Sequence, residues 1–392
     1  MRSQKSLLFA IFAKPHHANN VMLIKGIAKF AEERPDCHFK LLTPEMLQNG
    51  GFQERYDGIL CQIRNDALDA LARKSGIPLV DVRNSQPAPG SSIVDSDNVA
   101  VGRMAAEHFL ERRFTSFAFF GYRDTPYSIQ RKEGFFARLA DAGFRATAYE
   151  ADTSKWTSTK SWSLPGFDES RTRDLSPLKK ALRKLPRNTA VFCCHDNRAI
   201  SVLEACRICG IDVPRDIAVL GVDNDFVYGA FSHPRLSSID PSTEEIGYLA
   251  ARQVCELAEA PASRRTRRTI LIPPKEVVVR ESTECYPLDP PWLSDALVYI
   301  KRNATRGISA ADVFAALNRS HTQVSEAFRT VLRSTVQKEI VAVRMEEAKR
   351  LLAAGRMSAT DVAQACGFSS LHYFSQAFTT FTGKTPSDYA KA

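Results

Sequence analysis

Residues 358–389 of the chain read SATDVAQACGFSSLHYFSQAFTTFTGKTPSDY, and this stretch predicts two short helices joined by a tight turn. Ser358 and Asp361 have the spacing of a capping box, which sets the start of the first helix, and Gly367 ends it. The second helix has one apolar face and an opposite face of short polar side chains. This pattern is typical of a helix-turn-helix unit, whose second helix enters the major groove of DNA. The apolar stripe that we expect to be buried is Leu371, Phe374, Phe378 and Phe381.

The polar face of that second helix supplies candidate contacts to DNA. Short hydrogen-bonding side chains can reach base edges in the major groove, while nearby Arg and Lys side chains hold phosphates. The candidates on this face and in the turn before it are Ser369, Ser370, His372, Ser375, Gln376 and Thr379.

A similar unit is predicted over residues 308–332. Its first helix is expected at Ser309–Leu317, its turn at residues 318–320 and its second helix at His321–Leu332. On the second helix we expect Val324, Phe328 and Val331 to face inward. The candidates that face DNA are His321, Thr322, Ser325, Glu326 and Arg329.

One long helix, Val336–Ala354, is predicted between the two units, and Gly355 ends it. A rigid connector of this kind lets two reading helices occupy successive major-groove segments, about 34 Å apart along one face of DNA. The spacing alone leaves open a helical bundle whose polar faces only meet solvent. The charge favours an anionic partner such as DNA, since residues 290–392 hold 13 Lys and Arg against 8 Asp and Glu.

The two units together resemble a known DNA-binding family. Residues 367–378 and 383–389 are similar to the signature of AraC/XylS-type DNA-binding domains, and the resemblance extends over residues 293–390. It implies that both units bind operator DNA. The first unit departs from the family pattern, because Asn318 stands where Gly is common and Ala327 where an Arg often precedes the Phe.

The longer N-terminal part alternates short apolar runs with helical patterns. Continuous apolar strands separated by helices predict parallel sheets with helices on both faces. One sheet is too small for this length, so we expect two α/β lobes. The expected strands are Leu7–Ala13, Gly58–Gln62, Leu79–Val82, Phe117–Phe120, Ala190–Cys193 and Ile217–Val222, and the expected helices are Val21–Glu33, Ala67–Lys74, Val99–Arg112, Ile129–Ala142, Ser176–Lys184 and Arg198–Cys209.

Two breaks in the pattern suggest boundaries. The Ser- and Thr-rich segment 152–174 is expected to be an exposed excursion. A proline-rich joint then separates the lobes from the helical part. The expected domains are therefore an α/β domain over 5–284, a linker over 285–292 and an all-α domain over 293–390.

The α/β part resembles a second family. Residues 95–102 (DSDNVAVG) and 214–224 (PRDIAVLGVDN) are similar to the effector domain of LacI-type repressors and to sugar-binding periplasmic proteins, and 234–240 and 272–283 extend the match. The chain starts at the first sheet strand, so we expect the C-terminal module to replace the N-terminal headpiece of LacI-type repressors. This order resembles that of xylose operon regulators and implies a two-lobed periplasmic-binding-protein-like domain.

A small ligand of such a domain belongs in the cleft outside the carboxyl ends of the parallel strands. Asp196 and Asp223 each follow a predicted strand. The resemblance implies that their carboxylates accept hydrogen bonds from sugar hydroxyls and that Arg131 donates to sugar oxygens. Further polar candidates are Asn19, Asn20, Arg64 and Asn224, and the aromatic candidates for stacking on a sugar ring are Phe12, Tyr122, Tyr127 and Phe226.

Cysteine spacing and hydropathy indicate the compartment. Nine cysteines are scattered along the chain, and only Cys206 and Cys209 have a metal-like spacing, which on a helix is more typical of core residues. Scattered thiols of this kind suit the reducing cytoplasm, so we expect free cysteines and no metal. Residues 7–13 could imitate part of an export signal, but they are better explained as a buried strand. We expect a cytoplasmic protein that has no membrane segment.

Paired carboxylates in a cleft would also suit glycoside hydrolysis, so a sugar-processing enzyme is an alternative. The sequence contains no GxSxG, HExxH, P-loop or GxGxxG motif, and we expect no catalytic residue and no cofactor. The prediction is a sugar-responsive transcription regulator, most simply a homodimeric activator of D-xylose catabolism genes that works with RNA polymerase. The exact sugar, and activation as opposed to repression, stay open.

Overall fold

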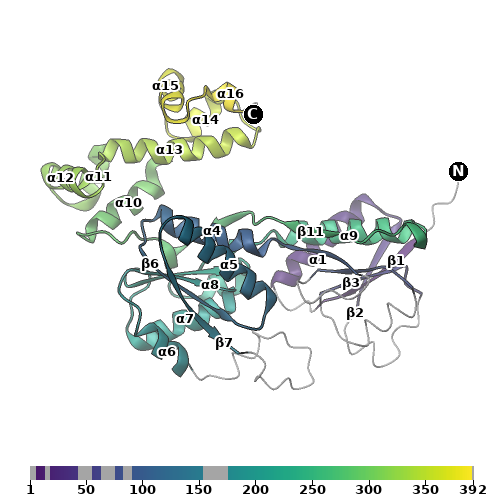
Figure 1. Ribbon diagram of the computed structural model, residues 1–392. Helices are drawn as coiled ribbons and strands as arrows, with labels where there is room; N and C mark the ends of the chain where they lie inside the picture. Colours follow the sequence, from purple (N-terminus) through teal and green to yellow (C-terminus); the bar gives the residue numbers. More distant parts are fainter. Residues whose placement is uncertain are drawn as a thin grey trace. The chain divides into compact units, whose positions relative to one another are not determined.

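The computed structural model describes residues 6–13, 18–42, 55–62, 76–82, 91–152 and 175–390 of the 392-residue chain. The chain divides into two compact units, Met1–Glu284 and Cys285–Ala392 (Figure 1). The first unit is α/β and the second is entirely helical in its described part. The predicted fold class is therefore confirmed.

The first unit contains two six-stranded sheets. The first sheet has the order β11-β5-β4-β3-β1-β2, and all its neighbouring strands are parallel. The second has the order β12-β10-β9-β8-β6-β7, and only the β10–β12 pair is antiparallel. The strands of the first sheet are β1 (Leu7–Phe12), β2 (Cys37–Leu42), β3 (Gly58–Cys61), β4 (Leu79–Asp81), β5 (Ser92–Ser96) and β11 (Thr269–Ile272), and those of the second are β6 (Ser116–Tyr122), β7 (Ala146–Ala151), β8 (Thr189–Cys193), β9 (Ile217–Val222), β10 (Ser237–Asp240) and β12 (Glu276–Val278).

Helices pack against both sheets. In the first lobe α1 and α9 lie side by side against the first sheet, and in the second lobe α4 packs on α5 (Figure 1). Each pairing leaves apolar side chains between helix and sheet, as strand–helix alternation requires. The helices of this unit are α1 (Ala18–Glu33), α4 (Asn98–Glu111), α5 (Pro126–Asp141), α6 (Ser176–Leu182), α7 (Asp196–Cys209), α8 (Phe226–Phe231) and α9 (Thr243–Glu259), with short 3-10 turns at Ala262–Arg264 and Glu281–Thr283.

The chain passes between the two lobes at three places in the described part. It leaves the first sheet after Ser96, returns from the second sheet after Asp240, and crosses again between Ile272 and Glu276. The first two crossings are hydrogen-bonded to each other, because the Ser96 hydroxyl donates to the Pro241 carbonyl over 3.1 Å. Neighbouring segments therefore connect the lobes. The carboxyl end of β10, a strand of the second sheet, lies at this crossing.

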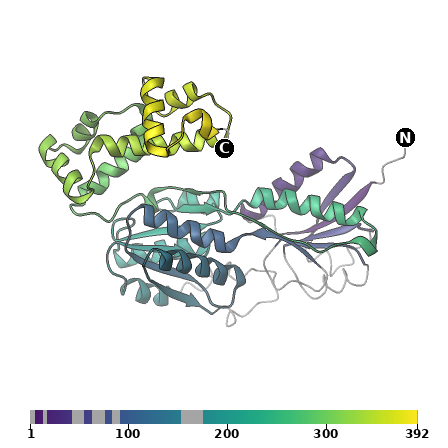
Figure 2. The same ribbon diagram turned by 45° about the horizontal axis from the view of Figure 1, so that its top comes forward.

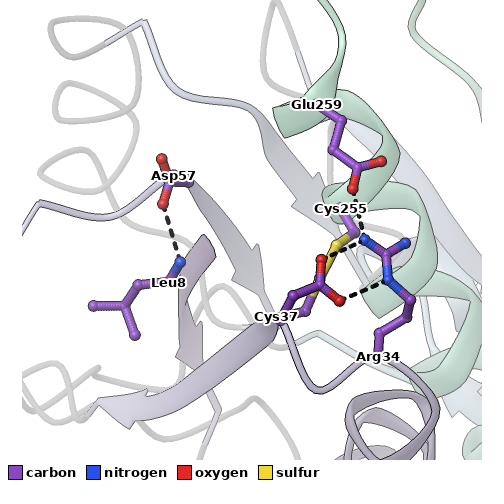
Figure 3. The surroundings of a disulfide bond; sticks show 7 residues. Leu8, Arg34, Cys37, Asp57, Cys255 and Glu259 are labelled. Carbon is purple, nitrogen blue, oxygen red and sulfur yellow. Dashed lines mark hydrogen bonds and ion pairs between the residues drawn. A yellow bond between two sulfur atoms is a disulfide. The ribbon is translucent and has the colours of Figure 1, made fainter. Parts of the chain in front are cut away.

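One prediction about the cysteines is wrong. Cys37, at the start of β2, and Cys255, on α9, form a disulfide across 218 residues of sequence (Figure 3). Arg34 ties the same two segments, since its guanidinium pairs with Asp36 at 2.9 Å and with Glu259 at 2.6 Å. The expectation of free thiols fails here because packing of α9 beside β2 brings together residues that no sequence spacing connects. The other seven cysteines, all among the described residues, form no disulfide, and Cys206 belongs to the core of the second lobe.

The second unit consists of helices arranged along α13. Helices α10 to α12 lie at one end of α13 and α14 to α16 at the other (Figure 2). In the part of the chain that the structure describes, no helix combines the length and apolar character needed to span a bilayer. The helices are α10 (Trp292–Asn303), α11 (Ala310–Leu317), α12 (His321–Val331), α13 (Val336–Ala353), α14 (Ala359–Ala365), α15 (Leu371–Thr382) and α16 (Pro386–Ala390), with a 3-10 turn, η5, at Ala304–Arg306.

Candidate functional site

Three neighbouring parallel strands of the second sheet, β6, β8 and β9, end at the same edge. Tyr122 ends β6, Asp196 follows β8 at the start of α7, and Asp223 follows β9. This arrangement brings polar residues from three separate stretches of sequence to one edge, as the resemblance implied. Arg131, on α5, reaches the same edge through its hydrogen bond to the Cys194 carbonyl.

Asp196 is a buried carboxylate whose oxygens are held by two donors. It is 2% exposed, and it accepts hydrogen bonds from the Ser238 hydroxyl at 2.7 Å and from the Asp225 backbone N–H at 2.8 Å. Burial raises the pKa of Asp196 well above its usual value, and the nearby charge of Asp223 raises it further. Residue 221 is glycine, and a Cβ there would lie 2.1 Å from Oδ1 of Asp196, so a larger residue would displace the carboxylate. Asp196 thus anchors the segment that carries Asp223.

Arg131 is also buried, at 6% exposure. Its Nε donates to Oδ1 of Asn98 at 2.9 Å and its Nη1 donates to the carbonyl of Cys194. The guanidinium lies 5.1 Å from the ring centroid of Tyr127, a distance typical of cation–π contact. The predicted arginine is therefore fixed in orientation beside an aromatic ring.

His195 lies at the same edge and was not among the residues predicted from the sequence. Its Nδ1 accepts the Arg198 backbone N–H at 3.1 Å, and its ring centroid is 5.5 Å from that of Tyr122 and 6.1 Å from that of Tyr127. Burial, with the charges of Arg131 and Arg198, lowers the pKa of His195 to about 3, so the imidazole is neutral near pH 7. The signal that could have found it is its position directly between a strand and a helix, where a side chain must point along the sheet edge.

Asp223 and Asn224 both have left-handed backbone angles, with φ of 120° and 50°. Asn224 is held by two hydrogen bonds. Its backbone N–H donates to the Ser238 hydroxyl at 2.9 Å, and its side-chain Oδ1 accepts from Arg280 at 2.7 Å. Both residues line a cavity of about 870 Å³ together with side chains of α1 and α9. That volume is in the range of small-molecule sites. Asp196 and Arg131 lie outside the cavity lining.

The structure places the remaining ligand candidates in different parts of the first unit. Asn20 is buried in the first turn of α1, and Phe12 is 1% exposed within the apolar core of the first lobe. Phe226 lines the cavity and is 78% exposed. The side chain of Asn19 and the whole of Arg64 lie outside the described residues, as does the predicted helix 67–74. No group of three His, Cys, Asp or Glu side chains suited to a metal occurs among the described residues.

In the first helix-turn-helix unit, α11 begins with a capping box. The Ser309 backbone N–H and hydroxyl both donate to Oδ2 of Asp312 at 2.8 Å. Asn318 supplies the left-handed turn with a φ of 49°, which Asn tolerates better than most residues. On α12 the candidates His321, Thr322, Glu326 and Arg329 are exposed and Ser325 is half-buried.

The inward face of α12 is predicted correctly for Val324 and Phe328, which are fully buried. The prediction is wrong for Val331, which is 39% exposed, because Leu332 at 6% exposure takes the inward position after the last helical turn.

The second helix-turn-helix unit repeats this arrangement. Ser358 and Asp361 form the predicted capping box, and Phe374 and Phe378 of α15 are fully buried. Leu371 and Phe381, which we expected in the core, are 43% and 44% exposed, since they lie at the two ends of α15 beyond the helices that cover its middle. The candidates Ser369, Ser370, His372, Gln376 and Thr379 are exposed, and Ser375 is half-buried.

Comparison with known proteins agrees with both units. Residues 106–283 match the periplasmic binding protein-like domain family, and residues 313–392 match a helix-turn-helix domain family. Xylose operon regulatory proteins of Escherichia coli K12 and of Haemophilus influenzae are each 27% identical over 85% of this chain, covering 83% and 84% of those proteins. The chain is a helix-turn-helix transcription regulator with a periplasmic binding protein-like domain. As a regulator of this kind it is not an enzyme, as expected.

Solved structures share the fold of this regulator. The structure of a xylose-binding transcription activator, xylR, has a TM-score of 0.61 and 23% identity and covers 100% of this chain and 99% of its own. A LacI family regulator from Enterococcus faecium, with bound ribose, has a TM-score of 0.54 and 18% identity over 72% of this chain and all of its own. At these identities the likeness concerns the architecture.

Proposed function

We propose that this regulator senses a pentose, with D-xylose as the first candidate, and activates genes for the breakdown of that sugar. Support comes from the xylose operon regulatory proteins, which are related over most of the chain. The alternative is a regulator of the same architecture that responds to another mono- or oligosaccharide. Ribose, which is bound in the neighbour from Enterococcus faecium, is also a pentose, so that neighbour does not distinguish D-xylose from another pentose.

The chemistry of the second sheet's edge suits a sugar. Carboxylates accept hydrogen bonds from hydroxyl groups, arginine donates to ring and hydroxyl oxygens, and aromatic rings pack on the apolar face of a pyranose. We assign Asp223, at the cavity, as an acceptor for a sugar hydroxyl. Arg131 and Tyr127, which contact each other outside the cavity lining, are assigned as the donor and the stacking ring on the resemblance to sugar-binding domains. Asp196 accepts two internal hydrogen bonds and has acceptor capacity left for a hydroxyl.

The observation that carries this assignment is the anchoring of Asp223 by Asp196. The buried carboxylate holds the Asp225 N–H, so the short segment after β9 cannot move without breaking that bond. A binding group fixed before the ligand arrives loses little conformational entropy on binding. Asp223 is thus preorganised as an acceptor at the cavity.

Calorimetry of the full chain with D-xylose, D-ribose, L-arabinose and D-glucose tests the proposal. Asp223→Asn is expected to weaken binding of the preferred sugar by about 5- to 150-fold, because it replaces one acceptor oxygen by an NH2 group that only donates, and a buried hydroxyl that loses its acceptor costs about 1–3 kcal/mol. The matched control is Glu204→Gln, on the exposed side of α7, where the side chain only pairs with Arg207. Unchanged affinity in Asp223→Asn would move the site elsewhere, and a preference for glucose would support the alternative.

On the DNA side, we propose that α12 and α15 read an operator in successive major-groove segments. The exposed polar faces of both helices support this role. A cytoplasmic homodimer would present two such pairs of helices to a repeated operator, and an activator would also contact RNA polymerase. Selection of sequences from random DNA by the purified chain tests this part. Recovery of no preferred sequence would contradict it.

Sugar and DNA must then be coupled through a change of state. A sugar can shift the regulator only by binding one arrangement of the lobes more tightly than another. The coupling is reciprocal, so bound operator must change sugar affinity by the same factor.

A further inference from the structure

The DNA-binding unit has two separate apolar cores. One is built from α10, α11, α12 and the first part of α13; its last fully buried residue on α13 is Ile340, and the half-buried Val343 packs against this core. The other is built from α14, α15 and the second part of α13; its first fully buried residue on α13 is Met345, and the half-buried Val341 packs against this core. Helix α13 connects the two halves in both views (Figures 1 and 2). Apolar packing therefore stabilises each half but leaves their mutual orientation to α13 and to whatever bridges them.

Arg344 lies on α13 between the two cores and is 6% exposed. Its Nε donates to the carbonyl of Ala304 and its Nη2 to the carbonyl of Ile308, both at 2.8 Å. These carbonyls belong to the first half, at η5 and just before α11. The guanidinium carbon also lies 5.3 Å from the ring centroid of Phe368, which is in the turn of the second half. One buried side chain thus touches both halves.

A close backbone approach lies beside this arginine. Gly367, in the turn between α14 and α15, has a φ of +77°. A Cβ at this position would lie 2.7 Å from the Thr305 carbonyl oxygen and 2.8 Å from the Gly307 nitrogen. The turn of the second unit therefore rests directly on the segment that Arg344 holds.

We propose that Arg344, with the contact at Gly367, is a positioning residue that fixes α12 and α15 relative to each other and so sets the spacing of the two DNA segments that the regulator accepts. The proposal rests on the proposed reading of DNA by these two helices. A planar guanidinium with two bound nitrogens restricts both tilt and twist, whereas a lysine ammonium in its place would hold one point only. We call Arg344 and the contact at Gly367 together the clamp. Without the clamp, bending of α13 would let the second half of the DNA-binding unit reach neighbouring base-pair positions on DNA.

The test compares operators that differ only in spacing. The full wild-type chain selects its preferred sequence, and one base pair is then inserted or deleted between the two contacted segments. Each such change moves the segments by about 3.4 Å and about 34° relative to each other. Wild type is expected to bind the selected spacing at least about tenfold more tightly than either altered one. Arg344→Met is expected to reduce that ratio to about threefold or less, with Arg344→Lys in between.

The control is Arg350→Met, on the same helix, where the arginine is exposed and pairs with Glu347. Its ratio is expected to equal that of wild type. The ratio is informative because a variant that merely unfolds loses affinity for all three operators by the same factor. If Arg344→Met does not fold, Arg344→Lys, which keeps one donor, carries the comparison. A wild-type ratio in the folded variant would overturn the proposal.

A distance measurement separates the clamp from the reading of DNA. Spin labels on genetically encoded amino acids at positions 330 and 380, on exposed ends of α12 and α15, report the separation without DNA. A narrow distribution in wild type that broadens in Arg344→Met supports the clamp. An unchanged distribution overturns it. Failure to select any sequence would refute the reading of DNA, and the distance distribution would then decide by itself whether the clamp exists.

Discussion

Replacing Gly221 by alanine tests the structure of the sensor most directly. The added Cβ would lie 2.1 Å from Oδ1 of Asp196 and 3.2 Å from Cδ2 of Leu236, so the carboxylate has to leave its place. It would then lose its hydrogen bonds from the Ser238 hydroxyl and the Asp225 N–H. Leaving a buried donor without its partner costs about 1–3 kcal/mol, so the loss of both bonds amounts to about 2–6 kcal/mol. This is a large part of the stability of an ordinary domain.

One assay is urea unfolding of the full chain, monitored by far-UV circular dichroism. A second assay measures sugar binding to the folded chain by calorimetry. We expect Gly221→Ala to lower the first unit's unfolding midpoint and to remove sugar binding. The control is Gly143→Ala. Gly143 has a φ of +81° with no atom within 4 Å of a built Cβ, so this variant should cost only the backbone strain of about 1–2 kcal/mol. Equal unfolding midpoints for the two variants would refute the role of Asp196 as the anchor of the segment after β9.

Three further predictions concern pH, base preference and coupling. The pKa of His195 is about 3 in the folded chain and near 6.5 when unfolded, so His195 contributes a stability that rises with pH between these values, by up to about 1.4 kcal/mol per unit. The raised pKa of Asp196 contributes the opposite slope, so the comparison with His195→Gln isolates the histidine: between pH 5 and 7 the free energy of urea unfolding should change by a more positive amount in wild type than in His195→Gln, and an equal change in both would contradict this prediction. Gln376→Ala should relax base preference by about 1–3 kcal/mol at one operator position, measured by repeating the selection, whereas Thr330→Ala should leave it unchanged. Saturating operator should change sugar affinity by about 5- to 150-fold in calorimetry, and a long Gly/Ser insertion at Pro290 should abolish the change. Equal sugar affinities with and without operator would exclude the switch.

The elements that the sequence predicts well are those buried on both faces. Strands β8 and β9 are buried along their whole length and read as unbroken apolar runs, so their limits in the structure fall within a residue of the predicted ones. The sequence does not predict six of the twelve described strands. Four of these, β2, β7, β11 and β12, lie at sheet edges, and the sequences CHFKLL of β2 and ATAYEA of β7 carry no clear period. The other two, β5 and β10, lie inside their sheets but are short and contain Ser and Asp, so they do not read as apolar runs. Pairing with a neighbour, which sequence does not reveal, makes them strands.

The site shows the same division. The position of Asp196, Asp223 and Arg131 near one sheet edge could be predicted, because each stands at a strand end or on the following helix, in motifs that resemble a known family. The anchoring of Asp196 by Ser238 and the contact with Gly221 join residues 42 and 25 positions apart, and no local pattern indicates them. The disulfide between Cys37 and Cys255 is hidden in the same way, since its partners meet only after α9 returns to the first sheet.

Asp196 and Arg344 are buried ionisable groups whose polar atoms are satisfied by neutral groups instead of opposite charges. Asp196 accepts from a hydroxyl and a backbone N–H, and Arg344 donates to two backbone carbonyls. Contacts between a charge and a buried dipole are screened much less by salt than exposed ion pairs are. Salt should therefore leave the clamp of the DNA-binding unit intact while it weakens contacts to phosphates through counterion uptake. It follows that the slope of operator affinity against salt concentration should be the same in wild type and in Arg344→Met, although their spacing preferences differ.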